Sequence, residues 1–228
     1  MKRMKKRMLA LAAVLVLAVS MLTGCGGMTE EDAKEYVKAT LDASYKADFD
    51  AYMKVTDSSK EEVQKLYDDN IENIVTSSGL QDMGITSELE EKYRELYKNM
   101  LSKAKYTVGD AKETDGGFEV VVKVEPFAFM EGVEGELTEA IQNELLAGDG
   151  SVPSEDEINQ MLLNKMYELL AARAEDPQYG AEEELKVTVE EKDNVYSISE
   201  EDLTKIDSRL FASVSYTHLR AHETSAHL

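Results

Sequence analysis

The sequence predicts an α+β domain in which an antiparallel sheet of about four strands, formed by two hairpins, packs against five or six helices. Two observations carry this prediction. Apolar residues recur at the three- and four-residue spacing of helices in some segments and at the two-residue spacing of strands in others. They also make up 43% of the chain, which is enough for a hydrophobic core. We assign this single domain to residues 29–213.

The first half of the domain is predicted to hold three helices and then a hairpin. The helices are expected over residues 29–47, 59–77 and 87–101. Each opens on a hydroxyl residue followed by an acid three residues later, which is the pattern of an N-cap, with Thr29, Ser59 and Ser87 as the capping residues. From Tyr106 the apolar period becomes two, and Thr114-Asp115-Gly116-Gly117 is a typical hairpin turn.

The second half is predicted to hold two helices, a hairpin and a last helix. The helices are expected over residues 137–147, 154–174 and 199–211, and the strands over residues 185–189 and 195–198. Ser154 with Glu157 is a further capping pair. Tyrosines on the apolar helical stripes are interpreted as core residues whose hydroxyls reach the rim.

The N-terminal segment has the three-part layout of a secretory signal peptide, which we assign to residues 1–24. Its first seven residues include five bases, and residues 8–19 form an unbroken apolar run. That run is shorter than the roughly 20 residues that a membrane span requires. Cleavage is expected between Gly24 and Cys25. An ordinary cleaved signal followed by an unrelated cysteine is the alternative.

Leu22-Thr23-Gly24-Cys25 resembles the lipobox of bacterial lipoproteins. The resemblance implies that the Cys25 thiol receives a diacylglycerol and that residues 25–28 become a lipidated tether. Two acyl chains give stable membrane anchoring. The expected location is therefore the extracytoplasmic face of the cell membrane. Cys25 is also the only cysteine, so no disulfide can form within one chain.

The charge balance restricts the classes of partner. The chain has 46 acids and 25 bases, and loss of residues 1–24 would remove five bases and no acid, leaving a formal net charge of −26. Such a surface argues against binding nucleic acid or anionic lipid headgroups. Most acids are spread over predicted helix faces, which favours an ordinary solvated surface. The protein or small-molecule partner remains unspecified.

Residues 214–228 are predicted to be an artefact. Val214 to Thr224 resembles the translation of a transposase-based sequencing adapter, and such segments are excluded from fold reasoning. All three histidines, His218, His222 and His227, fall in or just after this segment. They are therefore not interpreted as a metal site.

Two stretches, Tyr36 to Phe49 and Asp193 to Leu203, are similar to uncharacterised lipoproteins of Gram-positive bacteria that are described as domains of unknown function. The resemblance implies an NTF2-like or cystatin-like fold, which some of these proteins have. It implies no catalytic residue, because none is established for that group.

The rest of the chain holds no recognisable chemistry. It lacks a nucleophile with a histidine base, a histidine or cysteine cluster and a glycine-rich phosphate loop, so we predict no catalytic residue, metal site or cofactor. Asp110 and Glu119, on the first hairpin, are the only acids considered for acid–base work. Asp149 near Gly150 lacks the alternating carboxylates of a calcium loop.

These observations favour a non-enzymatic lipoprotein that binds a ligand or partner. An extracytoplasmic NTF2-like enzyme that uses carboxylates and tyrosines is the first alternative, and a purely structural envelope protein is the second. A pocket on the apolar face of the sheet would separate these hypotheses.

Overall fold

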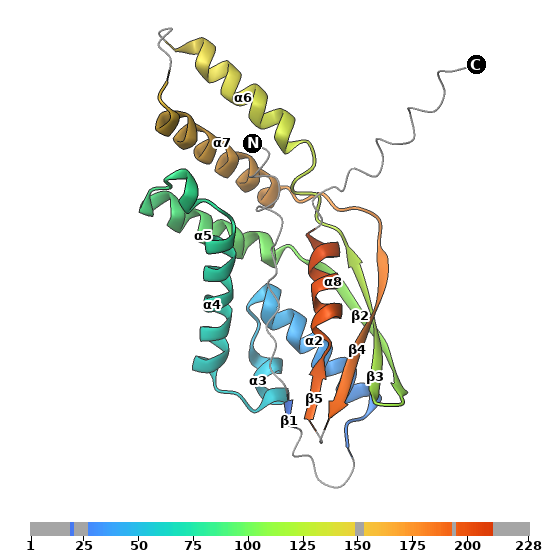
Figure 1. Cartoon of the computed structure of the whole chain (residues 1–228). Helices are drawn as coiled ribbons and strands as arrows, with labels where there is room; N and C mark the ends of the chain where they lie inside the picture. Colours follow the sequence, from blue (N-terminus) through green and yellow to red (C-terminus); the bar gives the residue numbers. More distant parts are fainter. Residues whose placement is uncertain (1–18, 21–26, 149–152, 193–194, 212–228) are drawn as a thin grey trace, which may run out of the picture.

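The computed structural model describes residues 19–20, 27–148, 153–192 and 195–211 (Figure 1). Within these ranges seven α-helices and one 3₁₀ helix accompany an antiparallel sheet, which confirms the predicted α+β class. The cleavage and lipidation residues Gly24 and Cys25 lie outside the described residues. So do Asp149 and the adapter-like segment 214–228.

The sheet is antiparallel throughout, in the order β1-β5-β4-β3-β2. Its strands are β1 (Val19–Ser20), β2 (Lys105–Thr114), β3 (Gly117–Glu125), β4 (Glu183–Lys192) and β5 (Val195–Ile198). The two predicted hairpins are β2–β3 and β4–β5, and pairing of β3 with β4 joins them as expected. The short β1 was not predicted, because it lies in the segment assigned to the signal peptide.

Seven α-helices accompany the sheet in the described part of the chain. They are α2 (Glu30–Lys46), α3 (Asp50–Thr56), α4 (Lys60–Ser77), α5 (Ser87–Ser102), α6 (Val133–Ala147), α7 (Glu155–Glu175) and α8 (Glu200–Leu210), and η1 (Gln81–Met83) is the 3₁₀ helix. The additional helix is α3, which has no side-chain cap to signal its start. Likewise α6 begins four residues before the predicted position, after Gly132 at φ 73°, because no capping side chain marks its first turn.

Three of the four predicted caps are confirmed. Thr29, Ser59 and Ser154 each form a reciprocal capping box with the acid three residues later. The prediction that Ser87 caps α5 was wrong. The extended residue before the helix is Thr86, whose hydroxyl accepts the Leu89 N–H at 3.3 Å. Two adjacent hydroxyl residues made the boundary ambiguous by one position.

The two faces of the sheet differ in chemistry. The inner face packs under α2 and α8 through side chains that are at most 5% exposed, among them Phe118, Val120, Val122, Val124, Val187 and Val189. The outer face carries cross-strand ion pairs, such as Lys186 with Glu119 at 2.8 Å and Lys105 with Glu125 at 2.7 Å. This alternation is what an antiparallel sheet with one solvated face requires.

The helical tyrosines belong to the core, as the sequence indicated. Tyr36, Tyr45, Tyr52, Tyr67, Tyr93 and Tyr97 are all at most 6% exposed, and Tyr167 is partly buried against the same core. The buried apolar residues of the sheet and helices form a single cluster. Tyr93 connects two helices, because its hydroxyl donates to the Leu163 carbonyl of α7 at 2.7 Å.

The α6–α7 pair forms a helical hairpin that projects from one end of the molecule (Figure 1). The start of α2 and the β2–β3 turn lie at the opposite end. The proximal side of the hairpin is held by packing of α7 on α5, where the Tyr93 and Tyr167 ring centroids are 5.6 Å apart. Within the described ranges, no helix combines the length and apolar character needed to cross a membrane.

Candidate functional site

Two tyrosines and two carboxylates meet between the sheet and the helices, where a sheet-face ligand would have to bind. The Tyr106 hydroxyl from β2 donates to Asp42 Oδ1 of α2 at 2.6 Å. The Tyr45 hydroxyl donates to Asp207 Oδ1 of α8 at 2.7 Å. The two tyrosine rings contact each other, with centroids 5.8 Å apart. The cluster therefore ties α2 to both the sheet and the last helix.

The charges of this cluster are fixed by its neighbours. Burial works to raise the pKa of Asp42, but hydrogen bonds from Lys38, Tyr106 and Lys46 outweigh it and the pKa is lowered. Burial and the adjacent Asp42 carboxylate raise the pKa of Tyr106. Burial and Asp207 likewise raise the pKa of Tyr45. At neutral pH the tyrosines are therefore donors and Asp42 is an ionised acceptor.

This cluster is a packed network. Asp42 and Asp207 are 6% and 7% exposed, and Tyr45 is fully buried. Their polar atoms point at one another, and Phe211 packs against the Tyr45 ring at 5.7 Å. A general acid or base must reach a substrate atom. Here each carboxylate is engaged by a tyrosine hydroxyl, and the Tyr45 ring packs between Tyr106 and Phe211.

Sequence reasoning missed Asp42 as a site residue, although the signal was present. Asp42 lies on the buried side of a stripe that it shares with Tyr45, and Lys38 and Lys46 are four residues away on either side. An acid at a core position flanked by two bases at that spacing indicates a buried, paired carboxylate.

Asp110 and Glu119 lie at the surface of the first hairpin. Asp110 is exposed, between Val108 and Ala111 where the register of β2 shifts. Glu119 is engaged by Lys186 on the outer sheet face. Acid–base catalysis uses two acids enclosed in a cleft, and the hairpin gives these two side chains no enclosed setting.

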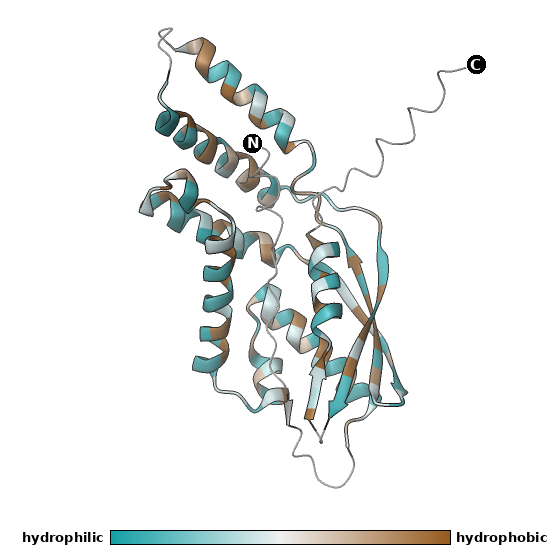
Figure 2. Cartoon of the chain, in the orientation of Figure 1, coloured by the Kyte–Doolittle hydropathy of each residue, from teal (hydrophilic) through white to brown (hydrophobic). Residues whose placement is uncertain are grey.

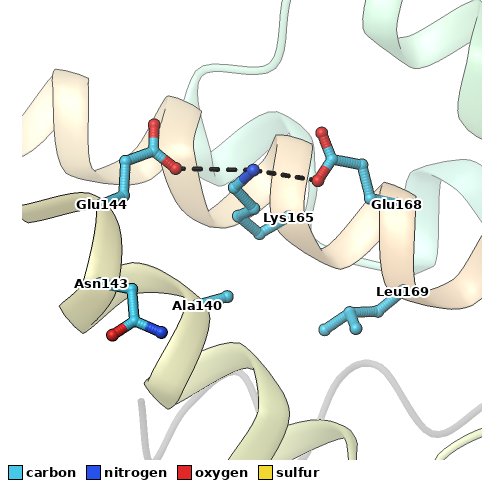
Figure 3. Close-up of a pocket in the computed structure, with 6 residues that line it drawn as sticks. All are labelled: Ala140, Asn143, Glu144, Lys165, Glu168 and Leu169. Atoms are coloured by element: carbon cyan, nitrogen blue, oxygen red, sulfur yellow. Dashed lines mark hydrogen bonds and ion pairs between the residues drawn. The ribbon is translucent and has the colours of Figure 1, made fainter. Parts of the chain in front are cut away.

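A pocket of about 410 Å³ lies between α6 and α7 (Figure 3). It is lined by Ala140, Asn143, Glu144, Lys165, Glu168 and Leu169. The Lys165 ammonium lies 3.0 Å from Glu168 Oε2 and 3.6 Å from Glu144 Oε2, so it bridges the two helices. Ala140 and Leu169 supply an apolar wall beneath this bridge (Figure 3).

Beside the pocket, the apolar stripe of α6 becomes exposed toward its end. Val133 and Leu137 are 1% and 7% exposed, whereas Leu145 is 41% and Leu146 is 84% exposed. Figure 2 shows this hydrophobic end of α6 at the outer tip of the hairpin. Leu145 and Leu146 are large hydrophobic residues presented to solvent on a helix that is otherwise rich in acids.

The hairpin surface is strongly negative. Together α6 and α7 carry nine acids and two bases. Both bases are already paired with hairpin acids, Lys165 as above and Arg173 with Glu136 at 2.5 Å. The pKa of Lys165 is raised by its hydrogen bond to Glu168, so it stays charged and paired.

The predicted tether ends against the sheet. The Met28 side chain is 7% exposed and its backbone N–H donates to the Tyr196 hydroxyl of β5 at 3.3 Å. Among the described residues that follow Cys25, the first buried one is therefore Met28, three residues further on. Among the described residues, no three His, Cys, Asp or Glu side chains gather as a metal centre would need.

No family model matches the chain, and no curated protein matches it either. The fold is similar to a crystal structure of ycdA, an inferred lipoprotein of Bacillus subtilis, with a TM-score of 0.54 and 15% identity. The match covers 79% of this chain and 56% of ycdA, so the chain spans little more than half of that structure. At this identity the likeness shows a shared fold, seen in an inferred lipoprotein from a Gram-positive bacterium.

Proposed function

We propose that this chain is a lipoprotein anchored through Cys25 to the extracytoplasmic face of the cell membrane, and that its domain binds a partner through the α6–α7 hairpin. The lipobox-like Leu22 to Cys25 and the fold shared with an inferred lipoprotein support the anchor. The observation that carries the binding role is the hairpin tip, where Leu145 and Leu146 stand exposed beside an open pocket.

An exposed leucine alone is ordinary on a protein surface. Here Leu145 continues a stripe that is buried nearer the body, and Leu146 follows it on the exposed side of the helix. A pocket with an apolar wall lies on the same helix pair. Exposed apolar surface rimmed by polar residues is typical of interaction sites. The hairpin also projects from the body, which gives a partner access to both helices (Figure 1).

The same geometry favours binding over catalysis. The tyrosines and acids that could do chemistry are engaged with one another inside the core. The pocket between α6 and α7 holds an amide and a lysine that two carboxylates already neutralise. Such a lining can recognise a surface but offers no activated nucleophile.

The anchor is tested with Cys25→Ser. We expect the wild-type chain to be membrane-bound and to incorporate labelled palmitate, because acylation needs the thiol. The variant should incorporate none. Ser20→Ala, upstream of the lipobox-like residues, is the matched control and should be labelled as wild type is. Labelling of Cys25→Ser at the wild-type level would contradict the proposed anchor.

The binding role is tested by placing a photoreactive phenylalanine analogue at Leu146 in the membrane-bound chain. Because Leu146 is 84% exposed at the tip, the probe should capture a partner as an adduct of one defined mass. The same probe at Val121, on the outer sheet face, is the control. Identical adducts at both positions, or none at Leu146, would count against a hairpin-specific partner.

A further inference from the structure

The exposed face of α6 combines apolar and acidic side chains in one row. Glu139, Asn143 and Leu146 are spaced by four and three residues, which places them on one side of the helix. Asn143 also lines the pocket. Leu146 therefore lies on the side of α6 that carries Asn143, with an acid two turns away on the same side. A partner that covers the leucine must also meet the acid.

The negative charge of the hairpin restricts the classes of partner that can bind to it. With nine acids against two paired bases, α6 and α7 repel a second copy of themselves and any anionic lipid surface. A cationic partner is attracted, and opposite charges at the rim would speed its association. The acids at the start of α7, such as Glu155 and Asp156, are exposed at the same tip as Leu146.

The backbone of the hairpin favours a helical occupant over an extended one. Helices satisfy their own N–H and C=O groups, so α6 and α7 offer no ladder of hydrogen bonds to an added strand. Their side chains instead form a groove into which a third helix can lay an apolar stripe. Leu145, Leu146, Ala140 and Leu169 supply the matching apolar contacts.

We propose that the α6–α7 hairpin binds an amphipathic helix of a partner protein whose apolar stripe is flanked by Lys or Arg residues. This inference rests on the proposed partner-binding function and adds the chemistry of the partner. The stripe covers Leu146 and the pocket wall, and the basic flanks pair with Glu139 and the acids that open α7.

A designed peptide tests this chemistry directly. The chain contains no tryptophan, so a single tryptophan in the peptide reports binding without a contribution from the chain. The probe is a Leu/Lys amphipathic helix of about five turns, ~18 residues. The full chain is held in nanodiscs of zwitterionic phosphatidylcholine, and the signal of empty nanodiscs is subtracted. One control peptide has Glu in place of Lys, and another has the same composition scrambled to remove the stripe.

We expect the Leu/Lys helix to bind, and raised salt to weaken it because the flanking pairs are exposed. Leu146→Gln should weaken binding about tenfold, as truncation of a central apolar contact does. Glu139→Gln combined with Glu155→Gln should weaken it about threefold at low salt, because rim charges act mainly on association. Val121→Thr and Glu184→Gln, on the outer sheet face, are matched controls and should leave binding unchanged.

Equal binding of the scrambled or acidic peptide would overturn the proposal. So would absence of binding, or binding that the hairpin substitutions leave unchanged. These outcomes are distinguishable from failure of the proposed function. If the Leu146 photoprobe captures a defined partner while the basic helix does not bind, the hairpin is an interaction site for another chemistry. If both fail, the hairpin is not the interaction site.

Discussion

Asp42 is a carboxylate on the buried side of α2 that its neighbours keep ionised. Lys38 and Lys46 contact it from one turn before and one turn after, and Tyr106 reaches it from the sheet. Removing one partner from such a group leaves buried polar atoms without compensation, which is more damaging than loss of a surface pair. Asp42 therefore matters for stability, and its contribution depends on pH.

The predicted effect of Asp42→Asn is loss of stability at neutral pH. The pKa of Asp42 is lowered in the folded chain, so its contribution is present above the unfolded value of about 3.9 and is lost as pH falls through the folded value. The variant should unfold more readily near pH 7 and show a flatter acid limb below about pH 5. Chemical denaturation at several pH values measures both.

Glu35→Gln is the matched control for Asp42→Asn, because Glu35 is exposed on the same helix. Its unfolding curve should follow that of wild type across the acid range. An Asp42→Asn variant with an unchanged acid limb would show that the network does not hold the carboxylate as described.

At the scale of helices and strands, the sequence predicted best those helix starts that neighbouring residues determine. The helices opened by Thr29, Ser59 and Ser154 were located well, because a hydroxyl and an acid three residues apart satisfy backbone donors wherever the helix packs. By contrast α3 has seven residues and no side-chain cap. Tertiary contacts such as the burial of Tyr52 take the place of a local signal there.

At the start of β3 the backbone of Gly117 lies so close to the backbone of β4 that no residue with a Cβ fits there without a clash. A Cβ at Gly117 would lie 1.9 Å from the Val189 carbonyl oxygen of β4, whereas one at Gly116 would meet nothing within 4 Å. Both residues have positive φ, 140° and 151°. The pair therefore separates the effect of backbone strain from that of a clash.

We expect Gly117→Ala to destabilise the fold by several kcal/mol, because the Val189 carbonyl belongs to the sheet and cannot yield cheaply. Gly116→Ala, the internal control, should lose about 1 kcal/mol from strain alone. Thermal unfolding of the two variants measures the difference. Equal losses would show that the clash at Gly117 is relieved by movement of β4.

Only some components of the α6–α7 hairpin site could be predicted from the sequence. The sequence indicated both helices and the acids on them, but not which apolar residues would remain exposed. Apolar residues between Ile158 and Ala174 occur on nearly every side of α7. The sequence pattern therefore does not show which side of α7 packs on α5 and which side packs on α6. The exposure of Leu146 depends on how α6 packs on α7, which is determined by contacts between residues that are distant in the sequence.

At the scale of the whole molecule, the core is unusually rich in tyrosine. Seven of the eleven tyrosines have a raised pKa, with burial as the leading cause: Tyr36, Tyr45, Tyr67, Tyr93, Tyr97, Tyr106 and Tyr179. Burial raises the pKa of Tyr97 to about 12. A raised pKa means that the stabilisation is complete below about pH 10, the unfolded value, and is lost as pH rises through the folded value.

Ionisation of these seven tyrosines should therefore be shifted to high pH and should accompany loss of helix in one cooperative step. Tyrosinate absorbance and circular dichroism followed in the same sample measure this, and the absence of tryptophan keeps the absorbance simple. Ionisation of all eleven tyrosines before any loss of helix would contradict the packed core described above.

The joining of the two hairpins into one sheet was predictable, because each had an apolar face that needed cover. The arrangement of the two ends of the molecule was not. The start of α2 and the hairpin tip lie at opposite ends only because α5 carries α7 away from the sheet (Figure 1).

The contact of Met28 with Tyr196 determines the length of the tether that would join the domain to its lipid anchor. Between Cys25 and Met28 there are three Cα steps, a reach of about 10 Å even when fully extended. A tether this short would keep the domain of an acylated chain at the bilayer surface while allowing it to rotate there. The hairpin tip would then be directed away from the membrane. Its partner would have to come to the membrane, and the size of the folded domain would determine the height at which they meet.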